Sequence, residues 1–239
     1  MAVWQLMGNL LERVREPEVM DRPDLDFSRH DRALHGLARL NRLSGSAGMF
    51  WPAIAGLAEV RRPLRILDVA SGGGDVVRGL WHRARRAGLE VDICGVDVSP
   101  RAVEFAQTRA DRIGVAVRFS VRDVLGGELP DDFDVVISSL FLHHLDKEAA
   151  IGLLVRMGAA ARRRVLVNDL VRSRRGLILA HMAARLLTAS RVVWVDAPRS
   201  VRAAFTLEEV RDLTRVSGLR RATVSPRWPC RMLLDWNHP

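Results

Sequence analysis

Hydrophobic positions along the chain follow two spacings, and the spacing changes near residue 64. Four leucines from Leu34 to Leu43 recur at every third position, which indicates one apolar face of a helix. Ser28 precedes them and predicts an N-cap, because its short side chain can accept a hydrogen bond from a free backbone N–H group. Residues 1–60 are therefore predicted to form a helical cap.

After residue 64, short apolar runs alternate with longer amphipathic stretches, a pattern typical of βα units in a mostly parallel sheet. The pattern predicts strands near residues 64–70, 91–97, 116–121, 133–139 and 163–169. It predicts helices near residues 74–87, 100–113 and 146–161. Ser99 and Pro100 suit the cap and the first position of the second of these helices.

The last third of the chain interrupts this alternation and then completes it. Residues 171–204 predict an arginine-rich, partly helical insertion that serves as a lid. Thr206 and Glu209 have the spacing of a capping box and predict the start of another helix. Two closing strands are predicted near residues 219–225 and 229–236.

This order of elements predicts an α/β fold class, a doubly wound sheet of seven mostly parallel strands over residues 61–239. One such domain with a helical cap suits a length of 239 residues. Ligands of these sheets bind at the carboxyl ends of the strands, so the residues that follow each strand are the candidates for function.

The cysteines and the N-terminus predict a cytoplasmic protein. Cys94 and Cys230 are far apart and have the spacing of neither a zinc site nor a disulfide framework. The first residues lack the basic start and cleavage site of a secretory signal. The most apolar stretch, residues 177–195, contains three basic side chains, whereas a membrane span needs about 20 nearly uncharged residues. We therefore expect no transmembrane segment.

The net charge of +9 raises the question of an anionic partner. Of the 37 basic residues only Lys147 is a lysine, which resembles the codon bias of a GC-rich genome more than selection for phosphate binding. Nucleic acid is therefore not the expected partner. The arginines at 162–164 and 172–175 leave an anionic substrate, a carrier protein or a lipid surface open, and the sequence leaves a homodimer open as well.

A glycine-rich turn preceded by a carboxylate follows the first predicted strand. Here the sequence reads Asp68-Val-Ala-Ser-Gly-Gly-Gly-Asp75. Glycines let a ligand approach the backbone N–H groups, and the helix N-terminus behind them favours negative charge. Asp68 could bind a cationic amine, whereas it would repel the pyrophosphate of a dinucleotide.

Two more carboxylates follow the next two predicted strands. Asp97 lies about 20 residues after the turn, where a carboxylate can accept two hydrogen bonds from ribose hydroxyls. Asp123 offers an acceptor for an exocyclic amine. The three carboxylates together indicate a nucleoside ligand.

These segments closely resemble the class I S-adenosylmethionine-dependent methyltransferases, over residues 64–170. The first motif of that family reads acidic-x-Gly-x-Gly-x-Gly, and this chain has alanine at the first glycine position. The resemblance implies a Rossmann-like sheet that binds S-adenosylmethionine and releases S-adenosylhomocysteine. It assigns the methionine part of the cofactor to Asp68, Ala70, Ser71, Gly72 and Gly74, the ribose to Asp97 and Val98, and the adenine to Asp123 and Val124.

The fourth predicted strand runs into Ser139-Leu-Phe-Leu-His143-His144, at the position that faces the transferable methyl group in that family. Ser139 is assigned to the cofactor site. The segment lacks the Asn/Asp-Pro-Pro-aromatic motif of enzymes that methylate base amino groups. His143 is the better candidate for a general base, because a histidine with a pKa near 6.5 can take the proton of a phenol. His144 is a second candidate or a residue that orients the loop.

Asp169 ends the fifth predicted strand at the same edge. It is expected to orient a histidine or bind the acceptor, with helix capping as the alternative. His181, Arg199 and Arg202 lie in the predicted insertion and are candidates for substrate contact, with plain surface charge as the alternative.

The sequence thus predicts O-methylation of a hydrophobic phenolic or polyketide-type metabolite in secondary metabolism, without a metal ion. Residues 30–45 and 199–206 also resemble a bacterial subgroup associated with type III polyketide synthases and flavin oxidoreductases, which implies a phenolic or quinone-like lipid. The alternatives are C-methylation of a quinone or polyketide ring, an RNA methyltransferase or RNA-binding protein, and a noncatalytic cofactor-binding scaffold.

Overall fold

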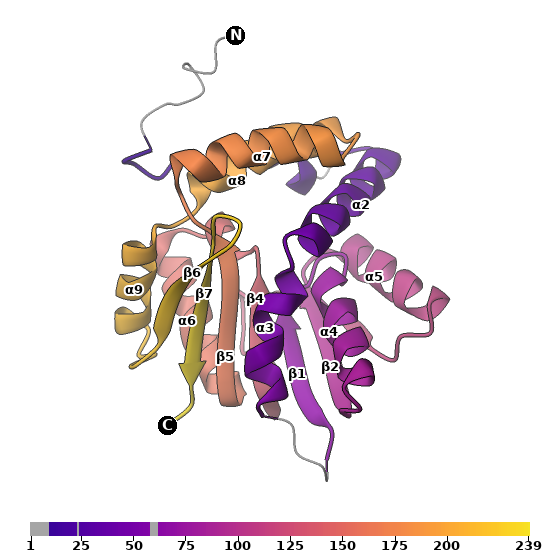
Figure 1. Cartoon of the computed structure of the whole chain (residues 1–239), viewed down its shortest axis with the longest axis vertical. Helices are drawn as coiled ribbons and strands as arrows, with labels where there is room; N and C mark the ends of the chain where they lie inside the picture. The colour runs from indigo at the N-terminus through magenta and orange to yellow at the C-terminus, as the bar shows by residue number, and fades with distance from the viewer. Residues whose placement is uncertain (1–9, 23, 58–61) are drawn as a thin grey trace.

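Figure 1 shows the protein as a computed structural model, which describes residues 10–22, 24–57 and 62–239. Its centre is a seven-stranded sheet in the order β3-β2-β1-β4-β5-β7-β6. The strands are β1 (Leu64–Val69), β2 (Val91–Asp97), β3 (Arg118–Val121), β4 (Phe133–Ser139), β5 (Ala161–Leu170), β6 (Thr223–Arg227) and β7 (Arg231–Asn237). Strands β1 to β5 run parallel, and β7 is antiparallel to both of its neighbours.

The central strands are buried on both sides, as their near-continuous apolar runs require. In β4 every residue except Ser139 is buried. The chain leaves β1 toward β2 and β3 on one side and returns at β4 on the other, so the strand order reverses between β1 and β4. The carboxyl ends of these two strands therefore border the crevice where ligands of doubly wound sheets bind.

Helices cover both faces of the sheet (Figure 1). On one face lie α3 (Ser46–Ala55), α4 (Asp75–Arg86) and α5 (Pro100–Arg112), and on the other lie α6 (Lys147–Ala160) and α9 (Leu207–Val216). Alternate residues of a strand pack into the hydrophobic cores on the two opposite faces of the sheet. Val136 packs with the α6 side, for example, and Ile137 packs with the α3 side.

Three helices form a roof across the carboxyl edge of the sheet (Figure 1). They are α2 (Phe27–Leu43), α7 (Arg174–Leu187) and α8 (Arg191–Ala203), joined by a small core of Ala33, Ala184, Val192 and Val193. Two short 3-10 helices contact this roof. The first, η1 (Val19–Asp21), packs against α8, and the second, η2 (Leu142–His144), contacts α8 and β5. None of the helices that the structure describes is long and apolar enough to cross a membrane.

The fold class predicted from the sequence is confirmed, and through β5 the predicted ends of strands and helices lie within two residues of the observed ones. The capping box of α9 is confirmed as well. Two details were wrong. Asp26, not Ser28, caps α2, and β6 begins at Thr223 because residues 218–222 form a turn with left-handed backbone at Gly218 and Arg221.

The N-terminal helical cap is only partly helical. Helices α2 and α3 supply its helices, but residues 10–18 have no regular secondary structure. Residues 1–9, 23 and 58–61 lie outside the described residues. The division into a cap and a domain at residue 60 stays a prediction.

Candidate active site

The turn between β1 and α4 depends on left-handed backbone. Ala70, Gly72 and Gly74 have φ angles of 57°, 51° and 69°. Glycine adopts this conformation readily, whereas alanine there costs about 1 kcal/mol. At Gly74 a side chain is also excluded by space, because a Cβ would lie 2.5 Å from the ring of Phe119. The chain therefore turns tightly into the N-terminus of α4 at the carboxyl edge of the sheet.

Two buried polar atoms beside this turn have no hydrogen-bond partner within the described part of the chain. They are Oδ1 of Asp68, whose residue is 1% exposed, and the hydroxyl of Ser71. Burial, followed by the negative charges of Asp97 and Asp75, raises the pKa of Asp68 well above its ordinary value. Buried polar atoms normally have partners, so these two indicate a place for a ligand that brings hydrogen-bond donors and positive charge.

Asp97, at the end of β2, is held by backbone groups. Its Oδ2 accepts a hydrogen bond from the N–H of Gly72 at 2.8 Å, and its Oδ1 accepts one from the N–H of Ser99 at 2.9 Å. Each carboxylate oxygen can accept a further bond, which is the requirement of a ribose with two hydroxyls. Asp97 is therefore fixed between the turn and α5 while it keeps acceptor capacity.

The remaining predicted cofactor residues lie along the same edge of the sheet. Val98 is 64% exposed beside Asp97, and Asp123 is exposed after β3. The side chain of Val124 is in the core, so only its backbone could face a ligand. Ser139 accepts a hydrogen bond from the amide nitrogen of Asn168 at 2.9 Å. The buried Oδ1 of Asn168 has no partner among the described residues, which adds a polar atom that the sequence did not single out.

His143 and Asp169 form a buried pair where β4 and β5 end. Nδ1 of His143 lies 2.7 Å from Oδ1 of Asp169, and the backbone N–H of His143 donates to Oδ2 at 2.9 Å. The two residues are 4% and 2% exposed. Because Asp169 accepts the hydrogen of Nδ1, Nε2 is the ring atom left for an acceptor. The structure thus brings together the histidine and the carboxylate that the sequence placed at neighbouring strand ends.

Residues 10–20, here called the N-terminal strap, cross over this pair. Arg13 donates to the carbonyl of His143 at 2.8 Å, and Arg15 donates to the carbonyl of His144 at 2.9 Å. The guanidinium of Arg13 also lies 3.6 Å from the centre of the Phe205 ring. The strap is therefore bound to the loop that carries both histidines.

Helix α8 holds the other end of the strap. Both carboxylate oxygens of Asp196 accept backbone N–H groups, from Val19 at 2.9 Å and from Met20 at 3.0 Å. Arg199 donates to the carbonyl of Pro17 at 3.0 Å and pairs with Glu16.

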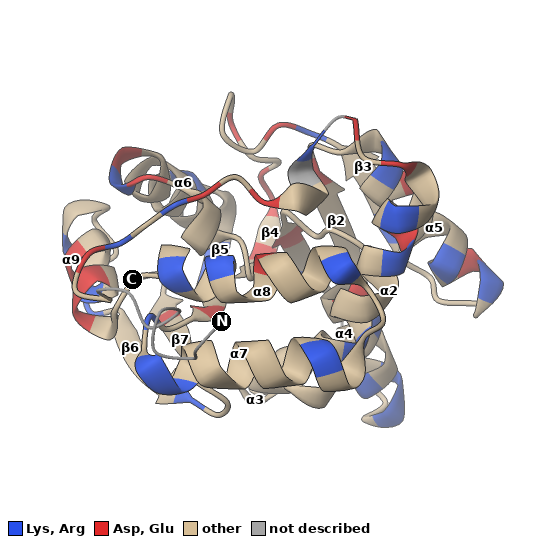
Figure 2. Cartoon of the chain, turned by 90° about the horizontal axis from the view of Figure 1, so that it is seen from above, with Lys and Arg blue, Asp and Glu red and all other residues tan. Residues whose placement is uncertain are grey.

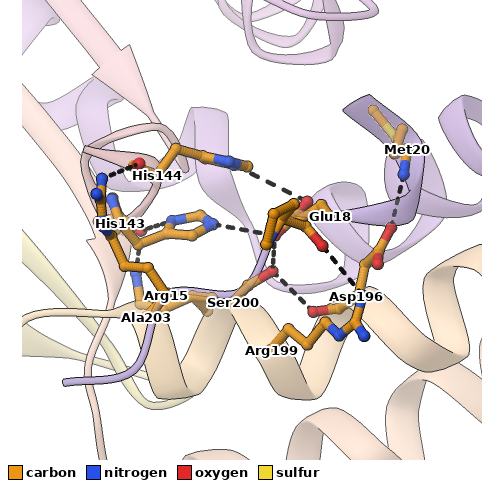
Figure 3. Close-up of polar contacts among 12 residues, drawn as sticks. Arg15, Glu18, Met20, His143, His144, Asp196, Arg199, Ser200 and Ala203 are labelled. Atoms are coloured by element: carbon orange, nitrogen blue, oxygen red, sulfur yellow. Dashed lines mark hydrogen bonds and ion pairs between the residues drawn. The ribbon is translucent and has the colours of Figure 1, made fainter. Parts of the chain in front are cut away.

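Glu18 is the strap residue that reaches the histidines (Figure 3). Its Oε1 lies 3.8 Å from Nε2 of His143, and its Oε2 lies 4.0 Å from Nε2 of His144. The hydroxyl of Ser200 donates a hydrogen bond to Oε1. Glu18 therefore occupies the position next to the ring atom that a general base would use.

These charges set the protonation states of the site. Burial alone would lower the pKa of His143, but the carboxylates of Asp169 and Glu18 raise it to about 10. Burial opposes the ionisation of Glu18, but the two histidines bring the pKa of its carboxyl down to about 2. Burial and the adjacent charge of His143 lower the pKa of His144 to about 4. With the strap in place, His143 is a cation between two carboxylates and His144 is neutral.

Glu18, His143 and His144 each place one ligand-type atom within 4.8 Å of the others, and two imidazoles with a carboxylate are a donor set that transition-metal ions use. The negative charges of Glu18 and Asp169 are already balanced by the His143 imidazolium and the nearby Arg13 guanidinium. A metal-free site therefore stays our prediction, and a chelator tests it below.

Of the three predicted substrate residues, His181 lies on α7, whereas Arg199 and Arg202 lie one turn apart on α8. The ring of His181 is 3.0 Å from the carbonyl of Leu177, one turn earlier in α7. Arg199 holds the strap, and the carbonyl of Arg202 accepts the N–H of Val14 at 3.3 Å. Their contact with an acceptor stays a prediction. The sequence missed Glu18 and Arg13, because an irregular segment gives no signal of where it docks.

The sheet and the carboxylates at its strand ends define a Rossmann-like fold of the nucleoside-binding class. Comparison with known proteins leads to the same class of fold. A family described as "Methyltransferase domain" matches residues 66–163. Demethylmenaquinone methyltransferase of Thermus thermophilus is 38% identical over 133 residues, which cover 54% of this chain and 59% of that protein. The Deinococcus radiodurans protein of the same name is 28% identical and covers 70% of this chain and 73% of its own length.

A solved structure shares the fold. The magnesium protoporphyrin IX methyltransferase of Synechocystis, crystallised with S-adenosylhomocysteine, has a TM-score of 0.57 at 18% identity, over 91% of this chain and 90% of that one. Residues 66–163 thus match a methyltransferase-domain family, and the chain has the fold of the class I S-adenosylmethionine-dependent methyltransferases. Its match spans 59% of the length of the Thermus relative.

The residues present fit the cofactor of this family. Asp68 and Ser71 offer unpartnered buried oxygens to a methionine ammonium, and Asp97 keeps acceptor capacity for the ribose hydroxyls. The turn at Gly72 and Gly74 leaves the backbone bare of side chains at the strand ends.

Replacing Asp68 by asparagine is expected to stabilise the free protein and weaken its affinity for S-adenosylhomocysteine. Between the ordinary pKa of an aspartate and the raised pKa of Asp68, the folded protein keeps a proton on this carboxyl and the unfolded chain does not. The free energy of unfolding of the wild type therefore falls as the pH rises from that ordinary value to the raised one, and the asparagine variant lacks this fall. Urea unfolding at pH 4 and pH 7 and calorimetry with S-adenosylhomocysteine measure both effects. Equal pH slopes in the two proteins would refute the assignment.

Replacing Asp97 by alanine is expected to weaken binding of S-adenosylhomocysteine by about 1–3 kcal/mol, through the loss of hydrogen bonds to a charged acceptor. Titration calorimetry measures the change. Asp92, partly exposed near the opposite end of β2, provides the matched control Asp92→Ala, which should bind normally. Unchanged affinity in Asp97→Ala would show that the ribose binds elsewhere.

Proposed function

We propose that this protein transfers the methyl group of S-adenosylmethionine to an oxygen atom of a hydrophobic phenolic or polyketide-type small molecule. The observation that carries the proposal is the buried His143–Asp169 pair, which lies at the carboxyl ends of β4 and β5, next to the strand ends that form the cofactor cradle. Relatives named for demethylmenaquinone support an acceptor of the quinone or phenol type. A cytoplasmic location stays a prediction.

His143 supplies the base in this proposal, and Glu18 must leave first. With Glu18 in place, two carboxylates keep a proton on the His143 ring. An acceptor hydroxyl that takes the position of Glu18 removes one of those charges and meets Nε2 directly. Without that charge the pKa of His143 falls, and the Nε2 proton passes to solvent as Glu18 leaves. The neutral Nε2 then accepts the hydroxyl proton during methyl transfer, while Asp169 holds the ring and stabilises the positive charge that forms. The cofactor, when bound, supplies an electrophilic methyl group on a sulfonium.

C-methylation of a quinone or polyketide ring is the second candidate, because the same base could remove the proton of a ring hydroxyl or ring carbon. The names of the two bacterial relatives favour it. Nothing in the described structure adds an RNA-binding element, so the RNA alternative gains no support.

The test is methyl transfer by the purified chain from S-adenosylmethionine with an isotope-labelled methyl group. The acceptors are alkylated phenols, hydroxyquinones and demethylmenaquinone, with bulk RNA as the comparison. NMR of the products separates O-methylation from C-methylation. The proposal expects labelled phenol ethers, and labelled RNA with no labelled phenol would overturn it. A second assay with a chelator should give the same rate, and its loss, restored by one divalent metal, would overturn the metal-free site.

A further inference from the structure

We propose that the outer surface of α7 and α8 docks the protein onto an anionic phospholipid bilayer. This docking face has an apolar centre and a basic rim. The centre consists of Ile178, Leu179, Met182, Leu186 and Val195, and the rim consists of Arg174, Arg175, Arg185 and Arg191. Docking goes beyond the proposed function. Only the further statement, that the bilayer supplies the lipid-soluble acceptor, rests on that function.

Helix α7 is apolar on two opposite sides. Leu177 and Ala184 are buried on one side, and Ala184 belongs to the small core that the roof helices share. On the outer side, Leu186 is 77% exposed and Met182 is 55% exposed, and Ile178 follows the same helical spacing. Single exposed apolar residues are common on protein surfaces, but a continuous stripe on one helix indicates an interface.

The charges around this stripe fit an anionic surface. The sequence of α7 contains no acidic residue, and the only one in α8 is Asp196, which is buried and accepts the backbone of the strap. Figure 2 shows basic residues at both ends of α7 with uncharged residues between them. In α8 the basic residues are separated by uncharged residues and by the buried Asp196. An interfacial helix has this design, because its apolar side enters the bilayer surface while guanidinium groups bind lipid phosphates.

The same charges argue against a second copy of the chain as the occupant. Two copies joined through this face would bring their rim arginines, which include Arg175 and Arg185, against each other without acidic residues of the face to pair with them. An anionic bilayer instead offers a phosphate to each arginine.

The position of the docking face gives the contact a use. The inner side of α8 carries Asp196 and Ser200, which hold the strap and Glu18 over His143. A bilayer against the outer side would lie directly above the candidate active site (Figure 1). A hydrophobic acceptor could therefore pass from lipid to the site without crossing much water.

Co-sedimentation with vesicles tests the proposal. The vesicles consist of phosphatidylcholine alone or of equal parts phosphatidylcholine and phosphatidylglycerol. We expect the wild type to bind the anionic vesicles at least about tenfold more tightly than the neutral ones, because each arginine near the surface contributes about fivefold. The double variant Met182→Glu with Leu186→Glu should lose at least about tenfold of the binding to anionic vesicles.

Matched variants separate the docking face from general charge. Val155→Glu with Val216→Glu makes the same change at exposed positions of α6 and α9 and should lose at most about threefold. In contrast, the rim variant Arg174→Gln with Arg175→Gln should lose about 30-fold of the affinity for anionic vesicles. Circular dichroism and the affinity for S-adenosylhomocysteine should be unchanged in all variants, which shows that they fold.

Any of three results would overturn docking. The wild type could bind anionic vesicles no more tightly than neutral ones, or the Met182→Glu, Leu186→Glu variant could bind as tightly as the Val155→Glu, Val216→Glu control. The third is a wild-type dimer in solution that the Met182→Glu and Leu186→Glu changes dissociate. None of these measurements uses an acceptor. Vesicle binding without methylation of any phenol would therefore refute the proposed function and leave docking intact, and methylation without vesicle binding would do the reverse.

Discussion

Replacing His143 by alanine is expected to slow methyl transfer by about 10²- to 10⁴-fold, the usual contribution of a general base. The affinity for S-adenosylhomocysteine should stay close to that of the wild type, because the cofactor cradle lies at the ends of β1 and β2. Single-turnover rates with a phenolic acceptor measure the first effect, and calorimetry measures the second.

Two neighbouring substitutions sharpen this test. Asp169→Asn keeps the shape of the pair but removes the charge that stabilises the protonated ring, so a large loss is expected there too. His144→Ala is the control, because that ring is more exposed and neutral, and its loss should be much smaller. An unchanged rate in His143→Ala would remove this residue as the base. A parallel loss of cofactor affinity would point to a structural role.

Replacing Arg172 by alanine is expected to lower the free energy of unfolding by about 3 kcal/mol, because two carbonyl groups lose their hydrogen-bond donor and a cavity remains. Its side chain is 2% exposed. It donates to both carboxylate oxygens of Glu209 at 2.7 and 3.0 Å, to the carbonyl of Ala204 at 2.7 Å and to the carbonyl of Leu10 at 3.0 Å. Glu209 is 39% exposed, so the ion pair itself contributes little, and most of the loss comes from the two carbonyls and the cavity.

Urea unfolding measures this loss, with Arg118→Ala as the control. Arg118 also pairs with a carboxylate, that of Asp92, but its side chain is 70% exposed. Exposed pairs of this kind contribute at most about 1 kcal/mol. Similar losses in the two variants would show that burial is not what makes the Arg172 contacts strong.

Local sequence signals predicted the sheet and the helices that cover it. Strands β1, β2, β4 and β5 contain short apolar runs, and runs of this kind reflect burial in a sheet. The pairing of His143 with Asp169 could be predicted for a related reason. His143 follows β4 and Asp169 lies near the end of β5, and neighbouring parallel strands bring their ends to the same edge of the sheet.

The rest of the site depends on contacts that no local pattern encodes. Glu18 lies in a segment without hydrophobic periodicity, so the sequence could not show that it reaches His143. The cap of α2 was misplaced for a smaller reason, since Asp26 and Ser28 both suit an N-cap and the hydroxyl of Ser28 itself donates to Asp26. The sequence excluded residues 177–195 as a membrane span, but it could not show which of their apolar side chains remain exposed.

In the proposed function the acceptor hydroxyl binds at Nε2 of His143, so Glu18 competes with the acceptor for this position from within the same chain. A group tethered by a short segment of chain acts at an effective concentration of about millimolar, whatever the amount of free ligand in the cell. A small phenol with few contacts would rarely displace it. The affinity that an acceptor needs to displace Glu18 would then favour large hydrophobic acceptors as much as the shape of any pocket does. Shortening the side chain in Glu18→Ala should therefore broaden the range of molecules that are methylated.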